Sequence, residues 1–398
     1  MNADSPDSGR LPLEGVVVVD LTRALSGPFC TMVLGDLGAT VYKVESEPHG
    51  DMTRTWGPFH DSESIYYLSC NRNKRSVAID LRSERGRSAV MDMLSHADVF
   101  VQNFKPGVAE EIGFGPDVLR KRHPRLICAD ISGFGRGGPY QDWPGLDQVA
   151  QGMSGLMSLT GDPGGAPTRV GVSIADMTAG LWLCIGILAA LAARPHTGSG
   201  AHVSTALLSS LVSMLGVNGQ RYLSSGEAPS RTGNDHPVIA PYGVFQAADG
   251  PLSIACATQV MWSHLCKELN EPDLAQDPRF IDNASRVSAR EPLREVLNQL
   301  LGRRSREYWL ARLLPAGIPA GPILTVAEVF NDPHVIASGG IQSLPHPRTG
   351  TLRVAANPIV FDGVRVGGDG LPPPRLGAHT AEFLAELERR RAMPVSKS

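Results

Sequence analysis

The sequence predicts an α/β fold in which a parallel, doubly wound sheet is accompanied by a smaller α+β domain. Short apolar runs rich in β-branched residues recur through the first third of the chain, and helical segments separate them. Strands buried on both faces have this composition, and their alternation with helices is typical of parallel sheets. A change of texture after residue 226 indicates the second domain.

Five runs are expected to form the sheet: Val16–Asp20, Thr40–Glu45, Ser76–Leu81, Asp98–Phe104 and Leu126–Ser132. The segment Arg87–Ser95 between two of them has helical periodicity. Ligands of such sheets bind at the carboxyl ends of the strands. Those ends carry Asp20, Glu45, Asp80, Asn103 and Ser132.

The second part of the chain has a different pattern. Two alternating runs flank Asp249-Gly250, which is a β-hairpin signal, and helical patterns follow at Val260–Leu269 and Glu291–Leu301. From Gly317 the chain returns to loops and short strands before a charged C-terminal helix. We therefore expect a large domain over 1–225, a small α+β domain over 226–316, and a C-terminal part over 317–398.

Composition excludes several classes of protein. Of the 398 residues 42% are hydrophobic, and the net charge of -3 gives no basic surface for nucleic acid. The six cysteines lack a Cys-x-x-Cys pair and the histidines lack a His-x-x-x-His pair, so we expect reduced thiols and no metal site. The polar first ten residues hold no signal-peptide core, which favours a cytoplasmic protein.

One uncharged stretch, Met177–Ala193, is barely long enough to span a bilayer. It is rich in Ala and Gly, and no aromatic belt flanks it. A helix buried against the sheet explains it better, so no membrane partner is expected.

Asp176 is the sharpest candidate for chemistry. An apolar run leads into it, and a long apolar helix is expected to begin directly after it. At a helix N-terminus the dipole and free amides stabilise a carboxylate and keep it ionised. An ionised Asp in a partly apolar cleft can act as a nucleophile. Spacing alone leaves open that Asp176 is simply an N-cap.

A glycine-rich loop within Phe134–Gly155 follows a buried strand. It lacks the Gly-x-Gly-x-x-Gly fingerprint in the first βα turn, so a nicotinamide cofactor is not indicated. Asp147, after the loop, is either a second carboxylate of the site or another helix cap.

Two basic segments are candidates for binding a phosphate group. The segment NRNKRS supplies Arg72, Lys74 and Arg75 beside a strand, although a solvated basic turn would look the same. The segment QNFKPG presents Asn103 and Lys105 at a strand end.

These segments, with LEGVVVVDLTRALSGPF, NRNKRSVAIDL, LICADISGFGRGGPY, HPVIAPYGVF and AGIPAGPI, occur in an order that spans nearly the whole chain. The sequence therefore resembles the class III CoA-transferase family, which includes formyl-CoA transferase, carnitine CoA-transferase and α-methylacyl-CoA racemase. The resemblance implies that Asp176 is the nucleophile and carries CoA as a covalent thioester. It also implies an acyl-CoA and a free carboxylic acid as substrates, with no permanently bound cofactor.

The family's architecture and its CoA site carry over as expectations. The large domain would be Rossmann-like and built from both chain ends, and two chains would interlock as a homodimer. The segments that match the family's CoA contacts contain Leu25, Ser26, Ile79, Asp80, Leu81, Arg82, Asn103, Phe104, Lys105, Leu146 and Asp147.

The sequence departs from the formyl-CoA transferase pattern. A His and a Gln of the first loop are Arg23 and Leu25 here, a phosphate-binding Arg is Glu111, and a glycine-run loop is absent. Formyl and oxalyl specificity is therefore in doubt. Arg23 is expected to pair with the second carboxylate of a dicarboxylic acid, unless it binds a CoA phosphate or only packs at the surface. His236 is a further candidate substrate contact, and succinyl-CoA is a candidate donor.

Other functions remain in competition. Family racemases place a His before the Asp of a Gly-His-Asp segment, and that position is Leu146 here, which cannot move a proton. A CoA-binding protein without turnover is the alternative from another class, and the presence of Asp176 argues against it. A Rossmann dehydrogenase is disfavoured by the missing fingerprint.

Overall fold

The computed structural model describes residues 11–368 and 370–392, so the expectation about the first ten residues lies outside the described part. The chain forms two compact units. Unit 1 consists of the described residues of Met1–Met157, Arg169–Gly226 and Pro333–Ser398, and unit 2 consists of Ser158–Thr168 and Glu227–Asp332. The expected change of domain at 226 coincides with a boundary between the units, whereas unit 2 continues to Asp332 rather than to 316.

Unit 1 contains a six-stranded sheet in which every strand pair is parallel, as predicted. In spatial order the strands are β5 (Lys74–Ala78), β2 (Thr40–Glu45), β1 (Val17–Asp20), β6 (Val99–Gln102), β7 (Ile127–Ser132) and β8 (His202–Ala206). Counted along the chain, this is the strand order of Rossmann folds.

The sheet differs from the prediction at two strands. β5 begins at Lys74 and ends at Ala78, whereas the apolar pattern placed it at Ser76–Leu81. Lys74 is fully buried and ion-paired, so a charged residue lies where the pattern indicates a loop. β8 was not expected, because His, Ser and Thr interrupt its apolar pattern.

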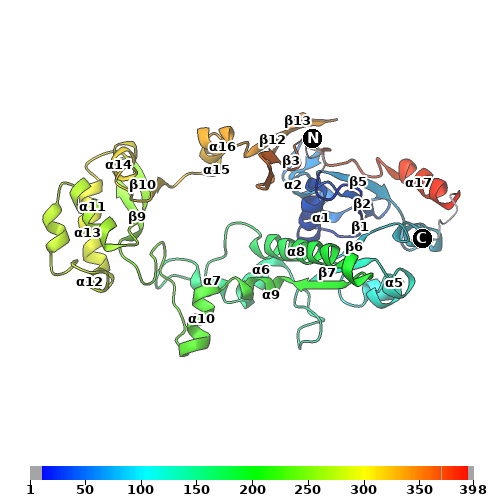
Figure 1. Cartoon of the computed structure of the whole chain (residues 1–398), viewed down its shortest axis with the longest axis horizontal. Helices are drawn as coiled ribbons and strands as arrows, with labels where there is room; N and C mark the ends of the chain where they lie inside the picture. The colour runs from blue at the N-terminus through cyan, green and yellow to red at the C-terminus, as the bar shows by residue number, and fades with distance from the viewer. Residues whose placement is uncertain (1–10, 369, 393–398) are drawn as a thin grey trace, which may run out of the picture. The chain divides into compact units, whose positions relative to one another are not determined.

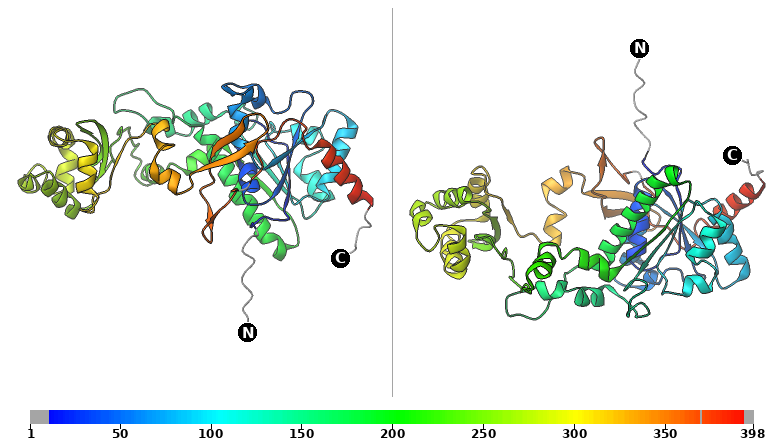
Figure 2. Two further views of the ribbon diagram at one scale, coloured as in Figure 1. Left: turned by 90° about the horizontal axis from the view of Figure 1, so that it is seen from above. Right: turned by 60° about the horizontal axis from the view of Figure 1, so that its bottom comes forward.

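Helices cover both faces of the sheet, because successive side chains of a strand point to opposite faces. Val18 packs in a core with α1 (Ser26–Asp36) and α8 (Ile174–Thr197). Val19 packs in a second core with α3 (Glu84–Leu94), α5 (Pro116–Arg122) and α17 (Thr380–Ala392). Figure 1 shows α1 and α8 side by side on the sheet. Figure 2 shows α17, in red, beside the edge of the sheet that β5 forms.

The remaining elements of unit 1 are short. They are the 3₁₀ helix Met52–Thr55, β3 (Phe59–His60), β4 (Glu63–Ser64), α2 (Ile65–Cys70), α4 (Val108–Glu111), α6 (Asp147–Met153), α9 (Leu207–Ser213), α10 (Gly216–Ser225), α16 (Pro333–Ala337), β12 (Ile341–His346), β13 (Gly350–Ala355), β14 (Val360–Phe361) and β15 (Val364–Arg365). The helix α7 (Leu156–Leu159) lies where the chain leaves unit 1.

α8 is the one helix of the described residues with the length and hydropathy of a membrane span. Only 39% of its most apolar window is buried, and the buried side includes Ala179, Leu183 and Ile187 in the core with α1. Leu181 and Trp182 are exposed on the other side. The helix was predicted correctly, but it is buried on one side only.

The C-terminal part of the chain joins unit 1 at the edge strand β5. The backbone N–H of His379 donates to the Ser76 carbonyl at 2.9 Å, and the hydroxyl of Thr380 accepts from the Ala78 N–H at 3.0 Å. Phe383 of α17 is fully buried in the core of that face. Both ends of the chain therefore contribute to one unit.

Unit 2 is a small α+β body. The predicted hairpin is β9 (Tyr242–Ala247) and β10 (Gly250–Ala255), which pair antiparallel, and β11 (Ala320–Pro322) adds a third strand. Its helices are α11 (Gln259–Glu268), α12 (Asn283–Ser288), α13 (Arg290–Leu301), α14 (Arg306–Leu313), α15 (Val326–Val329) and the 3₁₀ helix Pro272–Gln276. Trp262, Phe280 and Leu297 form its core.

Asp36 ties three segments of unit 1 together. Its buried carboxylate accepts two hydrogen bonds from Arg72, at 2.9 and 2.6 Å, and one each from Asn73 and Asn357. These bonds join the end of α1 to the start of β5 and to the C-terminal part. Breaking such a pair from one side leaves an uncompensated buried charge.

We expect Asp36→Ala to reduce the free energy of unfolding by about 3–5 kcal/mol, because Arg72 would stay buried without its partner. The control is Glu382→Ala, since Glu382 pairs with Arg75 at 3.5 Å in a half-exposed position and the loss should be at most about 1 kcal/mol. Urea unfolding of the full chain measures both values. Equal losses of unfolding free energy in the two variants would contradict this structural role of Asp36.

Candidate active site

The strand order predicts that a ligand binds at the carboxyl ends of β1 and β6. Connections leave these neighbouring strands toward opposite edges of the sheet, and ligands bind at such switch points. The side chain of Asn103, after β6, joins the two strand ends. Its Oδ1 accepts from the Arg23 N–H at 2.8 Å, and its Nδ2 donates to the Arg23 carbonyl at 2.8 Å. Asn103 therefore fixes the backbone of the loop after β1.

Asp20 holds the loop between β1 and α1. It is fully buried, and its Oδ1 accepts from the Thr22 N–H at 2.8 Å while its Oδ2 accepts from the Thr31 hydroxyl at 2.6 Å. A Cβ on Gly27 would lie 2.4 Å from the Thr22 Cβ, so only glycine fits this close approach. Asp20 was expected at a ligand-facing strand end, but it positions the start of α1 instead.

A cluster of buried charges lies beneath this loop. Lys74 pairs with Asp20 at 3.3 Å, Lys43 pairs with Asp51 at 2.9 Å, and Arg54 pairs with Glu45 at 2.7 Å. Burial lowers the pKa of Lys74 to about 8, against the opposing effect of Asp20. The three cations balance the three carboxylates, so burial of these groups is compensated.

The basic segment after Asn71 therefore has a different role from either one predicted. Arg72 and Lys74 are buried and paired with Asp36 and Asp20, and Arg75 pairs with Glu382. Arg72 and Lys74 are therefore neither a phosphate site nor part of a solvated turn. The run of polar residues in which they stand is typical of an exposed segment, so sequence reasoning did not predict this burial.

Asp176 lies in the first turn of α8, but it is not the N-cap. The helix begins at Ile174 with Ser173 as N-cap, whose side chain makes no capping hydrogen bond. Asp176 is half-buried at the third helical position. The interpretation of Asp176 as a simple cap is therefore wrong, and so is the expectation that the helix starts after it.

Asp147 supplies the missing cap from another helix. Its Oδ1 accepts from the Ala175 N–H, in the first turn of α8, at 2.8 Å. Its Oδ2 accepts from the Gln151 side chain at 2.7 Å. The predicted cap function is thus present, but Asp147 caps α8 and not its own helix α6, whose N-cap is Leu146.

Gln151 is a site residue that sequence reasoning missed. Its side chain is fully buried, and its Oε1 accepts from the Val170 N–H at 2.9 Å while its Nε2 bonds Asp147. It therefore fixes both the cap and the loop that enters α8. A glutamine one helical turn after Asp147 was the only available signal.

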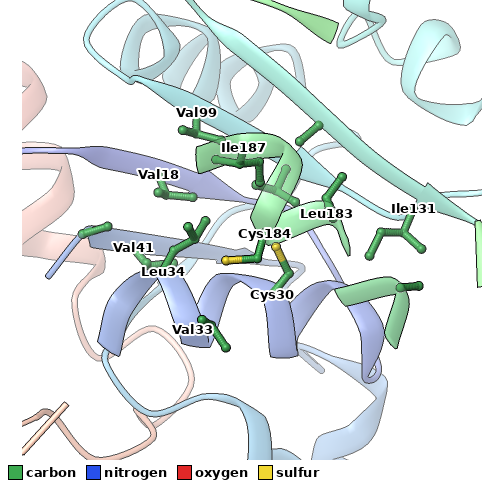
Figure 3. Close-up of a cluster of buried hydrophobic side chains, with 14 of the residues drawn as sticks. Val18, Cys30, Val33, Leu34, Val41, Val99, Ile131, Leu183, Cys184 and Ile187 are labelled. Atoms are coloured by element: carbon green, nitrogen blue, oxygen red, sulfur yellow. The ribbon is translucent and has the colours of Figure 1, made fainter. Parts of the chain in front are cut away.

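Close packing of α8 on α1 brings Asp176 to Ser26. A Cβ on Gly180 would lie 2.6 Å from the Ser26 carbonyl oxygen and 3.4 Å from the Cys30 nitrogen. Asp176 and Gly180 are four residues apart and so share one face of α8. In Figure 3, Cys30 and Cys184 face each other farther along the same contact.

The surroundings of Asp176 favour its neutral form. Burial, and then the charge of Asp147, raise the pKa of Asp176 to about 6, while a hydrogen bond with the Ser26 side chain lowers it. Contrary to the sequence-based expectation, the helix terminus does not determine the charge state alone. At neutral pH the carboxylate is still mostly ionised, and it is a stronger base than an ordinary Asp.

The other predicted CoA contacts lie at the carboxyl ends of strands. Ile79, Asp80, Leu81 and Arg82 follow β5, and Phe104 and Lys105 follow β6. Leu25 is the N-cap of α1, and Leu146 has 70% of its side chain exposed. His236 belongs to unit 2, where its ring stacks against Tyr242 at 5.0 Å.

Asp176 thus has the attributes of a carboxylate nucleophile. It is partly desolvated, its pKa of about 6 makes it reactive and ionised at neutral pH, and two separate helix termini fix its position.

Comparison with known proteins identifies the family of the chain. The sequence profile of CoA-transferase family III matches residues 13–380. The acetyl-CoA:oxalate CoA-transferase of Acetobacter aceti is 38% identical over the full length of both chains. The succinyl-CoA:glutarate CoA-transferase of Mus musculus is 39% identical and covers 95% of this chain and 87% of its own.

A CAIB/BAIF family protein from Brucella suis has a similar solved structure. It is 40% identical, with a TM-score of 0.85, and the match covers 95% of this chain and 99% of that one. The resemblance predicted from the motifs is confirmed over nearly the whole sequence. This chain belongs to CoA-transferase family III and is a CoA-transferase.

Proposed function

We propose that the enzyme moves CoA from an acyl-CoA to a free carboxylic acid through a covalent thioester on Asp176. The observation that carries the proposal is the placement of Asp176, half-buried beside Ser26 with its pKa raised to about 6. A structural cap would be expected to have its pKa lowered by the amides that it binds.

The proposed reaction begins when a carboxylate oxygen of Asp176 attacks the thioester carbon. The carbon–sulfur bond breaks, and a mixed anhydride and CoA thiolate result. The thiolate then attacks Cγ of Asp176, which releases the donor acid as a carboxylate and leaves the aspartyl-CoA thioester. The acceptor carboxylate repeats these two steps in reverse order, so no net proton, metal ion or redox cofactor is required.

The acids are proposed to be dicarboxylic, with succinyl-CoA or another dicarboxylyl-CoA as donor. Two relatives are named for oxalate and for succinyl-CoA and glutarate. Another relative, from Agrobacterium fabrum, is named succinate–glutarate CoA-transferase and is 37% identical. CoA would bind along the strand ends after β5, β1 and β6, with Asp147 beside the thioester.

The working form is proposed to be an interlocked homodimer in the cytoplasm. Exposed apolar side chains on α8 and α10 support this proposal, because a second copy of the chain would cover them. They include Leu181, Trp182, Val217 and Leu223, which are all at least 46% exposed. All six cysteines are free and buried, as suits a reducing compartment. Nucleic acid and membrane are not proposed as partners.

Two alternatives are weaker. A racemase needs acid-base groups on both sides of the α-carbon, and the position before Asp147 is the exposed Leu146. A CoA-binding protein without turnover would have no use for a carboxylate with a raised pKa beside Ser26.

We expect Asp176→Ala to abolish CoA transfer, because no other group would accept the acyl carbon, and to leave the circular dichroism spectrum unchanged. Hydroxylamine should inactivate only the wild-type enzyme that has been charged with donor, since it cleaves thioesters and anhydrides. Asp117→Ala, an exposed aspartate on α5, serves as the control. Near-wild-type rates in Asp176→Ala would refute the aspartyl mechanism.

The pH dependence of kcat/KM should report the ionisation of Asp176. Activity is expected to fall as the pH drops through about 6, because the nucleophile becomes protonated. Asp147→Asn removes a charge that raises this pKa, so its profile should move to lower pH. The CoA 3′-phosphate also titrates at about 6. The test is therefore the difference in the midpoint of the pH profile between Asp147→Asn and the wild type. An unmoved or raised midpoint would contradict the proposed coupling.

Proton exchange distinguishes the transferase from a racemase. In deuterium oxide, a 2-methylacyl-CoA should take up no deuterium at its α-carbon, because Leu146 cannot act as an acid or base. Mass spectrometry of the recovered thioester measures the label. Rapid uptake that disappears in Asp176→Ala would favour the racemase.

A further inference from the structure

Arg23 has a guanidinium that no other charge of the described residues neutralises. Its side chain is exposed, and its one described side-chain contact is the Phe104 ring, 5.0 Å from the guanidinium carbon. Five other arginines of unit 1, in contrast, have carboxylate partners: Arg54, Arg72, Arg75, Arg136 and Arg194. An exposed cation of this kind is available to an anionic ligand.

The place of Arg23 in the fold is fixed. Both polar atoms of the Asn103 side chain bind the Arg23 backbone, so the residue is held at the switch point between β1 and β6. Ser26, which hydrogen-bonds Asp176, is three residues farther along the chain, at the first position of α1. The backbone of Arg23 is therefore fixed three residues before the side chain that contacts Asp176.

The carboxylates at the site would repel an anionic acid, so binding of such an acid requires a cation nearby. Asp147 is a second carboxylate beside Asp176, and its charge adds to burial in raising the pKa of Asp176. A dicarboxylic acid adds a second negative charge that takes no part in the reaction, and repulsion would weaken its binding. The buried cations Lys43, Lys74 and Arg54 are already balanced by carboxylates.

We propose that Arg23 binds the non-reacting carboxylate of dicarboxylic substrates and so determines specificity for them. The inference rests on the proposed CoA transfer at Asp176. The Phe104 ring supports one face of the planar guanidinium, while its edge stays free to form two parallel hydrogen bonds with a carboxylate. Arg23 is thus a specificity residue that makes no bond to the reacting atoms.

The kinetic test compares Arg23→Leu with the wild type, using glutarate and butyrate as acceptors. The KM for glutarate should rise roughly tenfold to hundredfold, which corresponds to about 1.4–2.8 kcal/mol at 1.4 kcal/mol per decade. With acetyl-CoA as the donor, which has no second carboxylate, the KM for butyrate and for the donor should stay within about twofold. Arg23→Lys should give an intermediate loss, because it keeps the charge but lacks the planar fork.

A matched control is Arg122→Leu, an exposed arginine at the end of α5 that should change neither KM. Equal losses for glutarate and butyrate, or a loss confined to the CoA donor, would assign Arg23 to CoA binding and overturn the inference. An unchanged KM for glutarate would overturn it as well.

Binding without turnover separates this inference from the proposed mechanism. In the Asp176→Ala background, calorimetry should show that Arg23→Leu weakens glutaryl-CoA binding by about tenfold or more and leaves butyryl-CoA binding unchanged. Equal effects on the two thioesters would overturn the role of Arg23. If the wild type transferred CoA between no pair of acids while this difference in binding remained, only the proposed function would fail.

Discussion

The site depends on one close contact, that of α8 with α1 at Gly180. A single Cβ there would collide with the Ser26 carbonyl, so the two helix axes approach only because the residue is glycine. One turn earlier on the same face of α8 is Asp176, and the start of α1 presents Ser26 to it. The start of α1 is itself held by Asp20 and Lys74 from the sheet below, and the start of α8 by Asp147 and Gln151. The nucleophile is therefore positioned by two helix termini, each fixed by buried polar groups.

Charge is balanced in the buried cluster beneath the loop after β1, but not around Asp176. Beneath the loop after β1, three cations and three carboxylates balance one another, which makes their burial tolerable. Around Asp176 the balance is missing, because Asp147 is another carboxylate and Ser26 is neutral. Burial, and after it the charge of Asp147, raises the pKa of Asp176, whereas the balanced cluster gives rigidity. The exposed guanidinium of Arg23 lies three residues before Ser26 in the sequence.

Much of the fold could be predicted from local sequence patterns, because buried strands and hairpins require apolar and turn residues at regular positions in the sequence. β1, β2, β6 and β7, the hairpin at Asp249-Gly250 and the placement of Asp176 at a helix start all follow from such patterns. The contacts that join distant segments left no such trace. Burial of Lys74 requires Asp20, 54 residues earlier in the chain, and Gln151 gains its role from Val170 and Asp147 together. Asp147 was recognisable as a cap, but not as the cap of α8, since that depends on how two helices meet.

In the proposed mechanism, Asp176 carries CoA during transfer. The most direct measurement is the intact mass of the enzyme after brief incubation with succinyl-CoA in the absence of an acceptor acid, followed by peptide mapping. We expect a mass gain equal to CoA minus water, located on the peptide that contains Asp176 and lost when glutarate is added. An enzyme that transfers CoA without this adduct, or that carries it on another residue, would contradict the aspartyl mechanism.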